Sequence, residues 1–304
     1  MIYTLTLNPS VDYIMELQTF QKGGLNRGTK EETFPGGKGI NVSRVLHVLN
    51  VKSVALGFAG GFTGEYIKQF LYQETIETDF VEVNEMSRIN VKLKSDDETE
   101  INGSGPSILE EHLTHLLQKI SLLTDEDMLV LAGSIPSSVP KTFYHEIAKQ
   151  CEKQGTKVII DAEKSLIEPV LPLRPFLIKP NHHELGEIFG VTINTVEEAI
   201  HYGKKLKEKG AQNVIVSMAE MGALLLTENH VFYADVPKGE LKSSVGAGDS
   251  TVAGFLAGIS KGFALKDSFR LGTASGSATA FSIGLCDFEK VENLFEKIVI
   301  SEKQ

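Results

Sequence analysis

Short runs of apolar, mostly β-branched residues alternate along this chain with longer stretches of helical period. The runs predicted to be buried strands are 128–131, 158–161, 176–178 and 214–216. The intervening stretches predicted to be helices are 144–153 and 197–209. Strands that alternate with helices are typical of a parallel sheet covered by helices. The pattern therefore predicts an α/β fold, with a doubly wound, mostly parallel sheet flanked by helices.

Two further stretches carry apolar residues at i, i+3, i+4 and i+7, the spacing that places them on one face of a helix. They are Val42, Val45, Leu46 and Leu49, and Val252, Phe255, Leu256 and Ile259. Each helix is expected to lay this apolar stripe on the sheet.

Residues 12–34 and 88–101 break the alternation, because they are extended, polar and rich in turn residues. In the second segment polar residues alternate with Val91 and Leu93, and a turn is expected at 95–97. We interpret both segments as strands of a small lid sheet within a single domain that spans residues 1–304. An exposed strand edge is also a natural surface for a homodimer, although the sequence allows a monomer equally.

The charge balance limits the function classes. The 304 residues include 30 basic and 40 acidic side chains, a formal net charge of −10, which argues against a surface that binds nucleic acid. No apolar run approaches the roughly 18 residues of a membrane span, and Asn8 and Asp12 interrupt the stretch that a signal peptide would need. We therefore expect a cytoplasmic protein without membrane partners. Cys151 and Cys286 have no metal or redox spacing and are expected to be buried thiols.

Candidate chemistry begins with the segment Gly246-Ala247-Gly248-Asp249, immediately before the helical stripe that starts at Val252. Glycines at a helix start expose backbone amides, and these amides together with the helix dipole bind a developing phosphate charge. Because a carboxylate would repel phosphate there, Asp249 is better explained as a general base that accepts a hydroxyl proton. The alternative is an ordinary Asp in the first turn of a helix.

A second glycine segment, 36–41, also leads into a predicted helix and supplies Lys38 and Asn41. Its spacing does not match a Walker A loop, which needs four residues between its first Gly and Gly-Lys-Ser/Thr. The first strand likewise carries no dinucleotide fingerprint, so hydride transfer has no signature here. The alternative interpretation is a flexible turn and helix start.

Taken together, Gly36-Gly37-Lys38-Gly39-Ile40-Asn41, Lys179-Pro180-Asn181 with Glu184, and Gly246-Ala247-Gly248-Asp249 resemble the ribokinase-like, or PfkB, carbohydrate kinases over essentially the whole chain. The segments 6–12, 88–92 and 98–103 resemble the branch that acts on phosphorylated sugars, and the bacterial 1-phosphofructokinases in particular. This resemblance implies a ribokinase-like fold.

The resemblance also implies roles for individual residues. Asp249 would be the catalytic base, and the amides of Gly246, Ala247, Gly248 and Asp249 the anion hole. Sugar and sugar-phosphate contacts would come from Asp12, Gly37, Lys38, Asn41 and Arg88, with Arg27 as an addition. Fixed positive charge is what a phosphorylated substrate requires, and Arg can bind phosphate oxygens with two parallel bonds. For Arg88 and Arg27 the alternative is a solvated lid charge.

The ATP side is expected at Ser217, Met218, Ala219, Glu220, Met221 and Gly222, after the strand 214–216, together with Lys179, Asn181 and Gly248. Asn181 and Glu184 match the N-x-x-E element of the family, through which Glu184 would act on Mg²⁺ indirectly by way of water. A zinc site at His182 and His183 is disfavoured, because adjacent histidines point in different directions and no third spaced ligand follows. One departure is the run 137–139, which lacks a further glycine after Gly133-Ser134-Ile135-Pro136 and leaves any role of Ser134 open.

The expected activity is therefore ATP- and Mg²⁺-dependent phosphorylation of a sugar phosphate, with fructose 1-phosphate converted to fructose 1,6-bisphosphate as the first hypothesis. Kinases of tagatose 6-phosphate or fructose 6-phosphate are alternatives, because each substrate has one phosphate and one free primary hydroxyl. A non-catalytic sugar-phosphate sensor is the alternative of another class, and it would be expected to lack Asp249.

Overall fold

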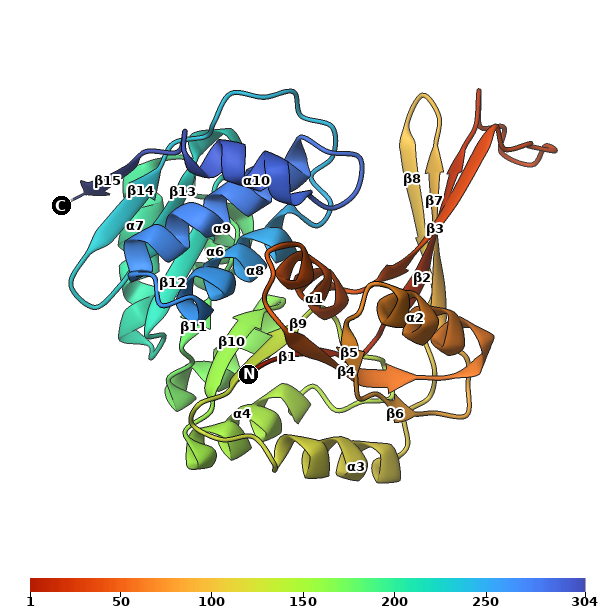
Figure 1. Ribbon diagram of the computed structural model, residues 1–304, viewed down its shortest axis with the longest axis horizontal. Coiled ribbons are helices and arrows are strands. Elements are labelled where there is room, and N and C mark those ends of the chain that lie inside the picture. Colours follow the sequence, from red (N-terminus) through yellow and green to blue (C-terminus); the bar gives the residue numbers. More distant parts are fainter. Residues whose placement is uncertain (304) are drawn as a thin grey trace.

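In the computed structural model, which describes residues 1–303, a large twisted sheet forms the centre of the molecule (Figure 1). Its strands follow the order β15-β14-β13-β12-β11-β10-β9-β1-β4-β5, and β6 pairs with the end of β4. The strands are β1 (Ile2–Thr6), β4 (Ser53–Ala59), β5 (Glu77–Thr78), β6 (Val81–Glu82), β9 (Met128–Ala132), β10 (Lys157–Asp161), β11 (Leu177–Ile178), β12 (Asn213–Ser217), β13 (Ala223–Leu226), β14 (Val231–Ala234) and β15 (Ile300–Lys303). All pairs from β5 to β12 are parallel, and β13 to β15 add antiparallel pairs at one edge.

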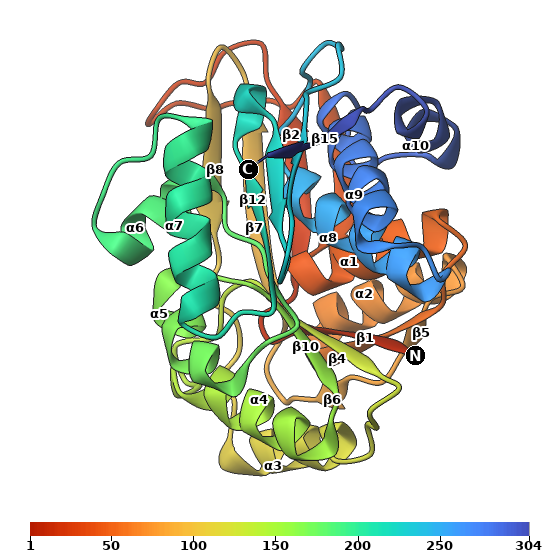
Figure 2. The same ribbon diagram turned by 90° about the vertical axis from the view of Figure 1, so that its left-hand side faces the viewer.

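Helices cover both faces of this sheet, as Figure 2 shows edge-on. One face packs against α1 (Lys38–Val48), α8 (Ala247–Ser260), α9 (Leu265–Ala280) and α10 (Phe288–Phe295). The other face packs against α3 (Glu110–Ile120), α4 (Phe143–Gln154), α5 (Lys164–Ile167), the 3₁₀ segment η1 (Glu168–Leu173), α6 (His182–Phe189) and α7 (Val196–Glu208). The prediction of a mostly parallel sheet between helices is confirmed.

The local patterns explain these elements. Strand β9 is buried along its whole length, as expected of a parallel strand covered on both sides. Helix α1 turns its Val42, Val45 and Leu46 stripe onto the sheet, and these side chains are at most 1% exposed. Each of the strands and helices predicted from the sequence is present, with ends shifted by one residue or two. Such shifts are ordinary at the ends of elements.

A second, four-stranded sheet stands away from the main body (Figure 1). It consists of β3 (Lys30–Gly36), β2 (Ser10–Glu16), β7 (Arg88–Lys94) and β8 (Glu98–Asn102), in that order. The predicted lid strands are confirmed, although residues 17–29 form a loop between β2 and β3. The expected turn at 95–97 is also present, where the Ser95 amide donates to the Asp97 carbonyl at 3.2 Å. Helix α2 (Gly61–Gln73) packs against both sheets near the base of the lid.

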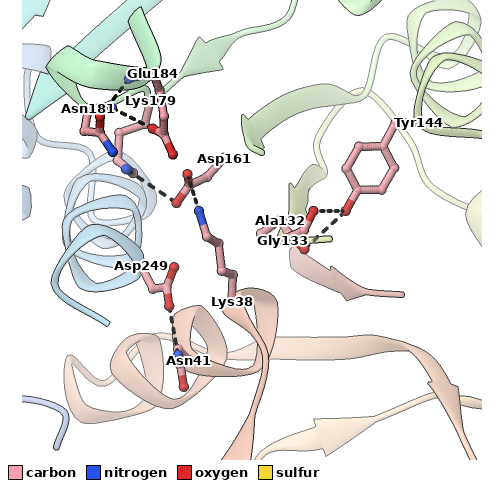
Figure 3. A network of polar contacts seen from close by, with 10 residues as sticks. All are labelled: Lys38, Asn41, Ala132, Gly133, Tyr144, Asp161, Lys179, Asn181, Glu184 and Asp249. Carbon is pink, nitrogen blue, oxygen red and sulfur yellow. Dashed lines mark hydrogen bonds and ion pairs between the residues drawn. The ribbon is translucent and has the colours of Figure 1, made fainter. Parts of the chain in front are cut away.

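This arrangement brings the chemically interesting segments to one end of the large sheet. The parallel strands β1, β9, β10 and β11 present their carboxyl ends there, and α1 and α8 begin at the same end (Figure 3). Ligands of doubly wound folds bind at this edge because the loops that leave the strands diverge there. Among the helices of residues 1–303, none is both long and apolar enough to cross a lipid bilayer.

Candidate active site

Asp249 lies in the first turn of α8, at the carboxyl edge of the sheet. The helix is preceded by Gly246 in the left-handed region (φ 78°), a conformation that favours glycine. In residues 1–303 the backbone amides of Gly248 and Asp249 have no hydrogen-bond acceptor. The Asp249 side chain is buried, and its Oδ2 accepts a hydrogen bond from Asn41 Nδ2 at 2.8 Å. The helix start therefore combines free anion-binding amides with a carboxylate held in place by α1.

A buried carboxylate, Asp161, joins two lysines beside Asp249 (Figure 3). Lys38 Nζ donates to Asp161 Oδ1 at 3.0 Å, and Lys179 Nζ lies 3.5 Å from Oδ2. Although burial disfavours charge, Lys179 and Lys38 hold the pKa of Asp161 below its ordinary value. The carboxylates of Asp161 and Asp249 outweigh burial and raise the pKa of Lys38. Lys38 is therefore cationic at neutral pH.

The lysines lie close to the start of α8. A Cβ placed on Gly248 would be 3.0 Å from Lys179 Nζ and 4.0 Å from Asp161 Oδ2. The free amides of the helix and the Lys179 ammonium therefore face one small volume, next to the ion pair of Asp161 with Lys38. Such a volume stabilises the negative oxygens of a phosphoryl group during transfer.

The electrostatics of the cluster suit Asp249 for proton transfer. Burial and the nearby charge of Asp161 raise the pKa of Asp249 to about 7, against the opposing effect of Lys38 and Asn41. A general base works best when its pKa lies near the operating pH, because it is then both available and strong enough. Asp249 therefore has the burial, position and basicity of a catalytic base.

The N-x-x-E element forms the start of α6. The Asn181 side chain accepts from the Glu184 amide at 2.8 Å, and Glu184 Oε2 accepts from the Asn181 amide at 2.8 Å. This reciprocal pair is a capping box, which satisfies two amides at the helix start. The pair therefore has a structural role, while the second oxygen of Glu184 has no hydrogen-bond partner in the described chain and lies on the side of the Lys179 cluster (Figure 3).

At the base of the lid, the polar side chains of β2 and β7 lie together. Asp12 Oδ1 accepts from Ser10 Oγ at 2.7 Å and from Asn90 Nδ2 at 3.0 Å. Gly36 leaves room for this group, since a Cβ there would lie 2.4 Å from Asp12 Oδ1. Gly37 follows as the residue before α1. These contacts fix the carboxylate of Asp12 beside Gly36. Gly36 precedes Lys38, the first residue of α1, by two positions.

Arg88, at the start of β7, is half-buried against main-chain carbonyls. Its Nε donates to the Asn8 carbonyl at 3.0 Å, and Nη1 approaches the Gly103 carbonyl at 3.4 Å. Burial lowers its pKa, opposed by the charge of Asp12. A guanidinium has five N–H donors, so further donors remain for a ligand.

Comparisons with known proteins agree with this geometry. Residues 5–291 match the model of the pfkB family carbohydrate kinases. The chain belongs to the pfkB family of carbohydrate kinases. It is 56% identical over 301 residues to the 1-phosphofructokinase of Bacillus subtilis (strain 168), covering 99% of each chain. It is 37% identical to the D-tagatose-1-phosphate kinase of Bacillus licheniformis, again over 99% of each chain.

The fold of this kinase is also found among solved structures. The crystal structure of phosphofructokinase-2 from Escherichia coli in complex with fructose-6-phosphate superposes with a TM-score of 0.91 at 26% identity. The match covers 97% of this kinase and 98% of that chain. The ribokinase-like fold expected from the sequence is therefore confirmed.

The nucleotide side of this kinase was predicted at 217–222, and these residues form the tight connection between β12 and β13. Ser217 pairs with Asn181 in an isolated bridge, which places the connection beside the capping box. The 3₁₀ turn η2 (Ala219–Met221) follows, and Ala219 has a positive φ of 50°. Met218 is fully buried, whereas Glu220 is exposed. The segment thus lies at the edge where Lys179 and Asn181 also emerge, and its contact with ATP stays a prediction.

Other expectations have mixed outcomes. Lys38, expected at the substrate's own phosphate, donates to Asp161, and its contact with the substrate stays a prediction. Arg27 lies exposed in the loop between β2 and β3, with no hydrogen bond or ion pair to another residue of the described chain. Ser134 is exposed after β9. Cys151 and Cys286 are free and buried, as expected.

His182 and His183 occupy the first two positions of α6. The rings of His182 and His183 lie 3.9 Å apart between centroids. Within residues 1–303 no group of three or more His, Cys, Asp or Glu side chains could hold a metal ion.

The sequence interpretation did not include Asp161 in the site. The only signal was its place as a charged residue that ends the apolar run 158–160. Because the carboxyl ends of parallel strands meet at the ligand edge, a charged residue at such an end is a site candidate. Its partners Lys38 and Lys179 are far away in the chain, so their ion pairs became visible only in the structure.

Proposed function

We propose that this kinase transfers the γ-phosphoryl group of ATP to the free primary hydroxyl of fructose 1-phosphate, which yields fructose 1,6-bisphosphate and ADP. Membership of a kinase family implies that ATP is the donor. The observation that carries the proposal is Asp249, a buried base with a pKa of about 7 at the amide-bearing start of α8. The choice of fructose 1-phosphate is supported by the relative at 56% identity.

In the proposed reaction Asn41 holds one oxygen of Asp249, so that the other oxygen accepts the proton of the substrate hydroxyl. The deprotonating oxygen forms a bond to the γ-phosphorus while the bond to the β–γ bridging oxygen breaks. The amides at the start of α8, with Lys38 and Lys179, stabilise the negative oxygens of the moving group. Asp161 positions these two lysines through its ion pairs with both of them. Arg88 and Asp12 hold the sugar phosphate under the lid.

Magnesium fits the groups at this site. Asp161 Oδ2 is buried without a hydrogen bond, and Glu184 offers a second carboxylate oxygen. Mg²⁺ is commonly bound by one or two carboxylates together with substrate phosphates and water. When bound, the ion would neutralise charge on the phosphates of ATP.

The tertiary arrangement also supports a homodimer through the lid. The lid face opposite Asp12 carries Tyr13, Val91 and Ile101 in one cross-strand row, and the Ile101 side chain is 57% exposed. An exposed apolar strand face is a natural association surface. Both ATP and sugar phosphates are intracellular metabolites, which agrees with the expected cytoplasmic location.

The test is a coupled assay of ADP release with ATP and Mg²⁺, in which fructose 1-phosphate, tagatose 6-phosphate, fructose 6-phosphate and unphosphorylated fructose are compared at equal concentrations. A clear preference for fructose 1-phosphate is expected. Preference for another sugar phosphate would reassign the substrate, and turnover of fructose alone would overturn the phosphate-binding role of Arg88. Binding of sugar phosphate without any turnover would indicate a sensor, although such a protein has no reason to retain Asp249.

A further inference from the structure

Lys92 is a second cation on the substrate-facing side of the lid, in addition to Arg88. Strands β2 and β7 pair in parallel with Asp12 opposite Asn90 and Ile14 opposite Lys92. Because side chains alternate along a strand, Asp12, Asn90 and Lys92 share one face. The opposite face carries Val11 and Ile89, which pack against α2. Lys92 therefore belongs to the polar face that begins at Gly36 and leads to α1.

The ammonium of Lys92 is enclosed and forms ion pairs with Asp12 and Glu100, but it makes no hydrogen bond in the described chain. Its side chain is only 12% exposed, and Nζ lies 3.7 Å from Asp12 Oδ2 and 3.6 Å from Glu100 Oε1. Both separations exceed hydrogen-bond length, and no other residue of the described chain accepts a hydrogen bond from Nζ. An ammonium has three donors, and a largely buried one is costly when they lack acceptors.

Asn90 gives an independent sign of a ligand at the same place. Its side chain is 7% exposed, and Nδ2 donates to Ser10 and Asp12, but Oδ1 is buried without a hydrogen-bond partner. The face thus holds an acceptor without a hydrogen bond next to an ammonium whose N–H groups have no hydrogen-bond acceptor. A sugar phosphate can satisfy both, because its hydroxyls donate and its phosphate oxygens accept.

We propose that Lys92 binds the phosphate of the sugar-phosphate substrate and determines the preference for phosphorylated over neutral sugars. The inference rests on the proposed function, since it takes a sugar phosphate to be the acceptor. Lys38 is engaged by Asp161, and Lys94 lies further along the strand toward the end of the lid. Lys92 and Arg88 are therefore the lid cations assigned to the substrate's own phosphate. Arg88 and Lys92 are four residues apart on one strand face, about 13 Å between Cα atoms, so both long side chains can reach a ligand between them.

The experiment compares Lys92→Met and Lys92→Gln with wild type in the ADP-release assay. Both variants are expected to raise the KM for fructose 1-phosphate by roughly tenfold or more, because a charge-assisted bond to phosphate is lost. The KM for ATP and kcat should stay close to wild type. Inorganic phosphate, used as a competitive inhibitor against the sugar, should inhibit both variants less than wild type. Lys92→Arg should recover part of the affinity.

Lys94→Gln is the matched control, because Lys94 lies two residues further along the same face. In the strand register it lies opposite Glu98 of β8. It should leave the sugar KM unchanged, and thermal unfolding checks that every variant is folded. An unchanged sugar KM in a folded Lys92→Gln protein would overturn the proposal. Failure of the proposed function would show differently, as wild-type protein that does not turn over fructose 1-phosphate at all.

Discussion

At the scale of single residues, five side chains from distant parts of the chain form the proposed catalytic cluster. Asp249 is held by Asn41, and its pKa is raised by burial and by Asp161, whose own charge is balanced by Lys38 and Lys179. Two carboxylates at one site thus have opposite pKa shifts, because only Asp161 has two close cations. Divergent shifts of this kind separate a proton-accepting group from one that stays ionised.

Asp249→Asn tests the base directly. The variant should lose about 10²- to 10⁴-fold in kcat, the usual contribution of a general base, while fructose 1-phosphate still binds. Its free energy of unfolding should exceed that of wild type by up to about 4 kcal/mol at pH 8, because the raised native pKa makes ionised Asp249 destabilising. This wild-type penalty develops as the pH rises from about 4 through about 7, so the difference should vanish near pH 4. Near-normal turnover in the folded variant would refute the assignment.

Asp161→Asn should change the pH dependence of activity. In wild type, log kcat/KM is expected to rise with pH and to level off above about pH 7, as Asp249 becomes ionised. Removal of the Asp161 charge takes away a group that raises the pKa of Asp249. The rising part of the profile of log kcat/KM against pH should therefore move to lower pH. The plateau should fall because Lys38 and Lys179 lose their anchor. A rising part that stays in place would show that Asp161 does not act on Asp249.

At the scale of elements, the site is assembled from starts of helices and ends of strands. Helix α8 contributes free amides, α1 contributes Lys38 and Asn41, and β10 ends at Asp161. The start of α6 combines a structural task with a proposed one, because Glu184 caps the helix with one oxygen and we propose that its other oxygen acts on Mg²⁺. These tasks can be separated by substitution.

Glu184→Gln keeps the capping geometry, since Gln also serves in a capping box, but removes the charge. Its unfolding free energy should stay within about 0.5 kcal/mol of wild type, while the Mg²⁺ concentration needed for half-maximal activity should rise. Asn181→Ala is the comparison that weakens the cap and should cost about 1 kcal/mol. Chemical denaturation and magnesium titration measure the two effects. Unchanged magnesium dependence in Glu184→Gln would limit Glu184 to its structural role.

At the scale of the whole molecule, the lid sheet stands apart from the main body and presents two different faces. The polar face carries Asp12, Asn90 and Lys92, for which we propose contacts with the substrate. The opposite face carries Tyr13, Val91 and Ile101 near the exposed edge strand β8. A lid with an apolar outer face is suited to pair with a second copy.

Ile101→Asp tests this pairing, because a charge in the centre of an apolar interface is costly to bury. Sedimentation velocity should give a dimer for wild type and a shift toward monomer for the variant. Glu98→Gln, on the other face of the same strand, should leave the association state unchanged. A wild-type monomer across the tested concentrations would refute the lid dimer.

Much of the architecture was predictable from residue patterns. The apolar runs at 128–131 and 158–161 became strands, and the interrupted segments became the lid, because burial and backbone geometry are governed by neighbouring residues. The glycine segment before Asp249 likewise indicated a helix start with exposed amides. The family resemblance of these segments was confirmed by the match over residues 5–291.

The tertiary structure alone decided which charges meet. Lys38 is bonded to Asp161, 123 positions away in the chain, and the capping bond between Asn181 and Glu184 leaves one carboxylate oxygen directed at the same cluster. Lys92 likewise could be recognised as a largely buried cation without a hydrogen bond only from its position against Asp12. Local sequence specifies the elements, because period and propensity act within a few residues. Pairing, burial and pKa depend on distances between segments, and these distances are set by how the sheets and helices pack.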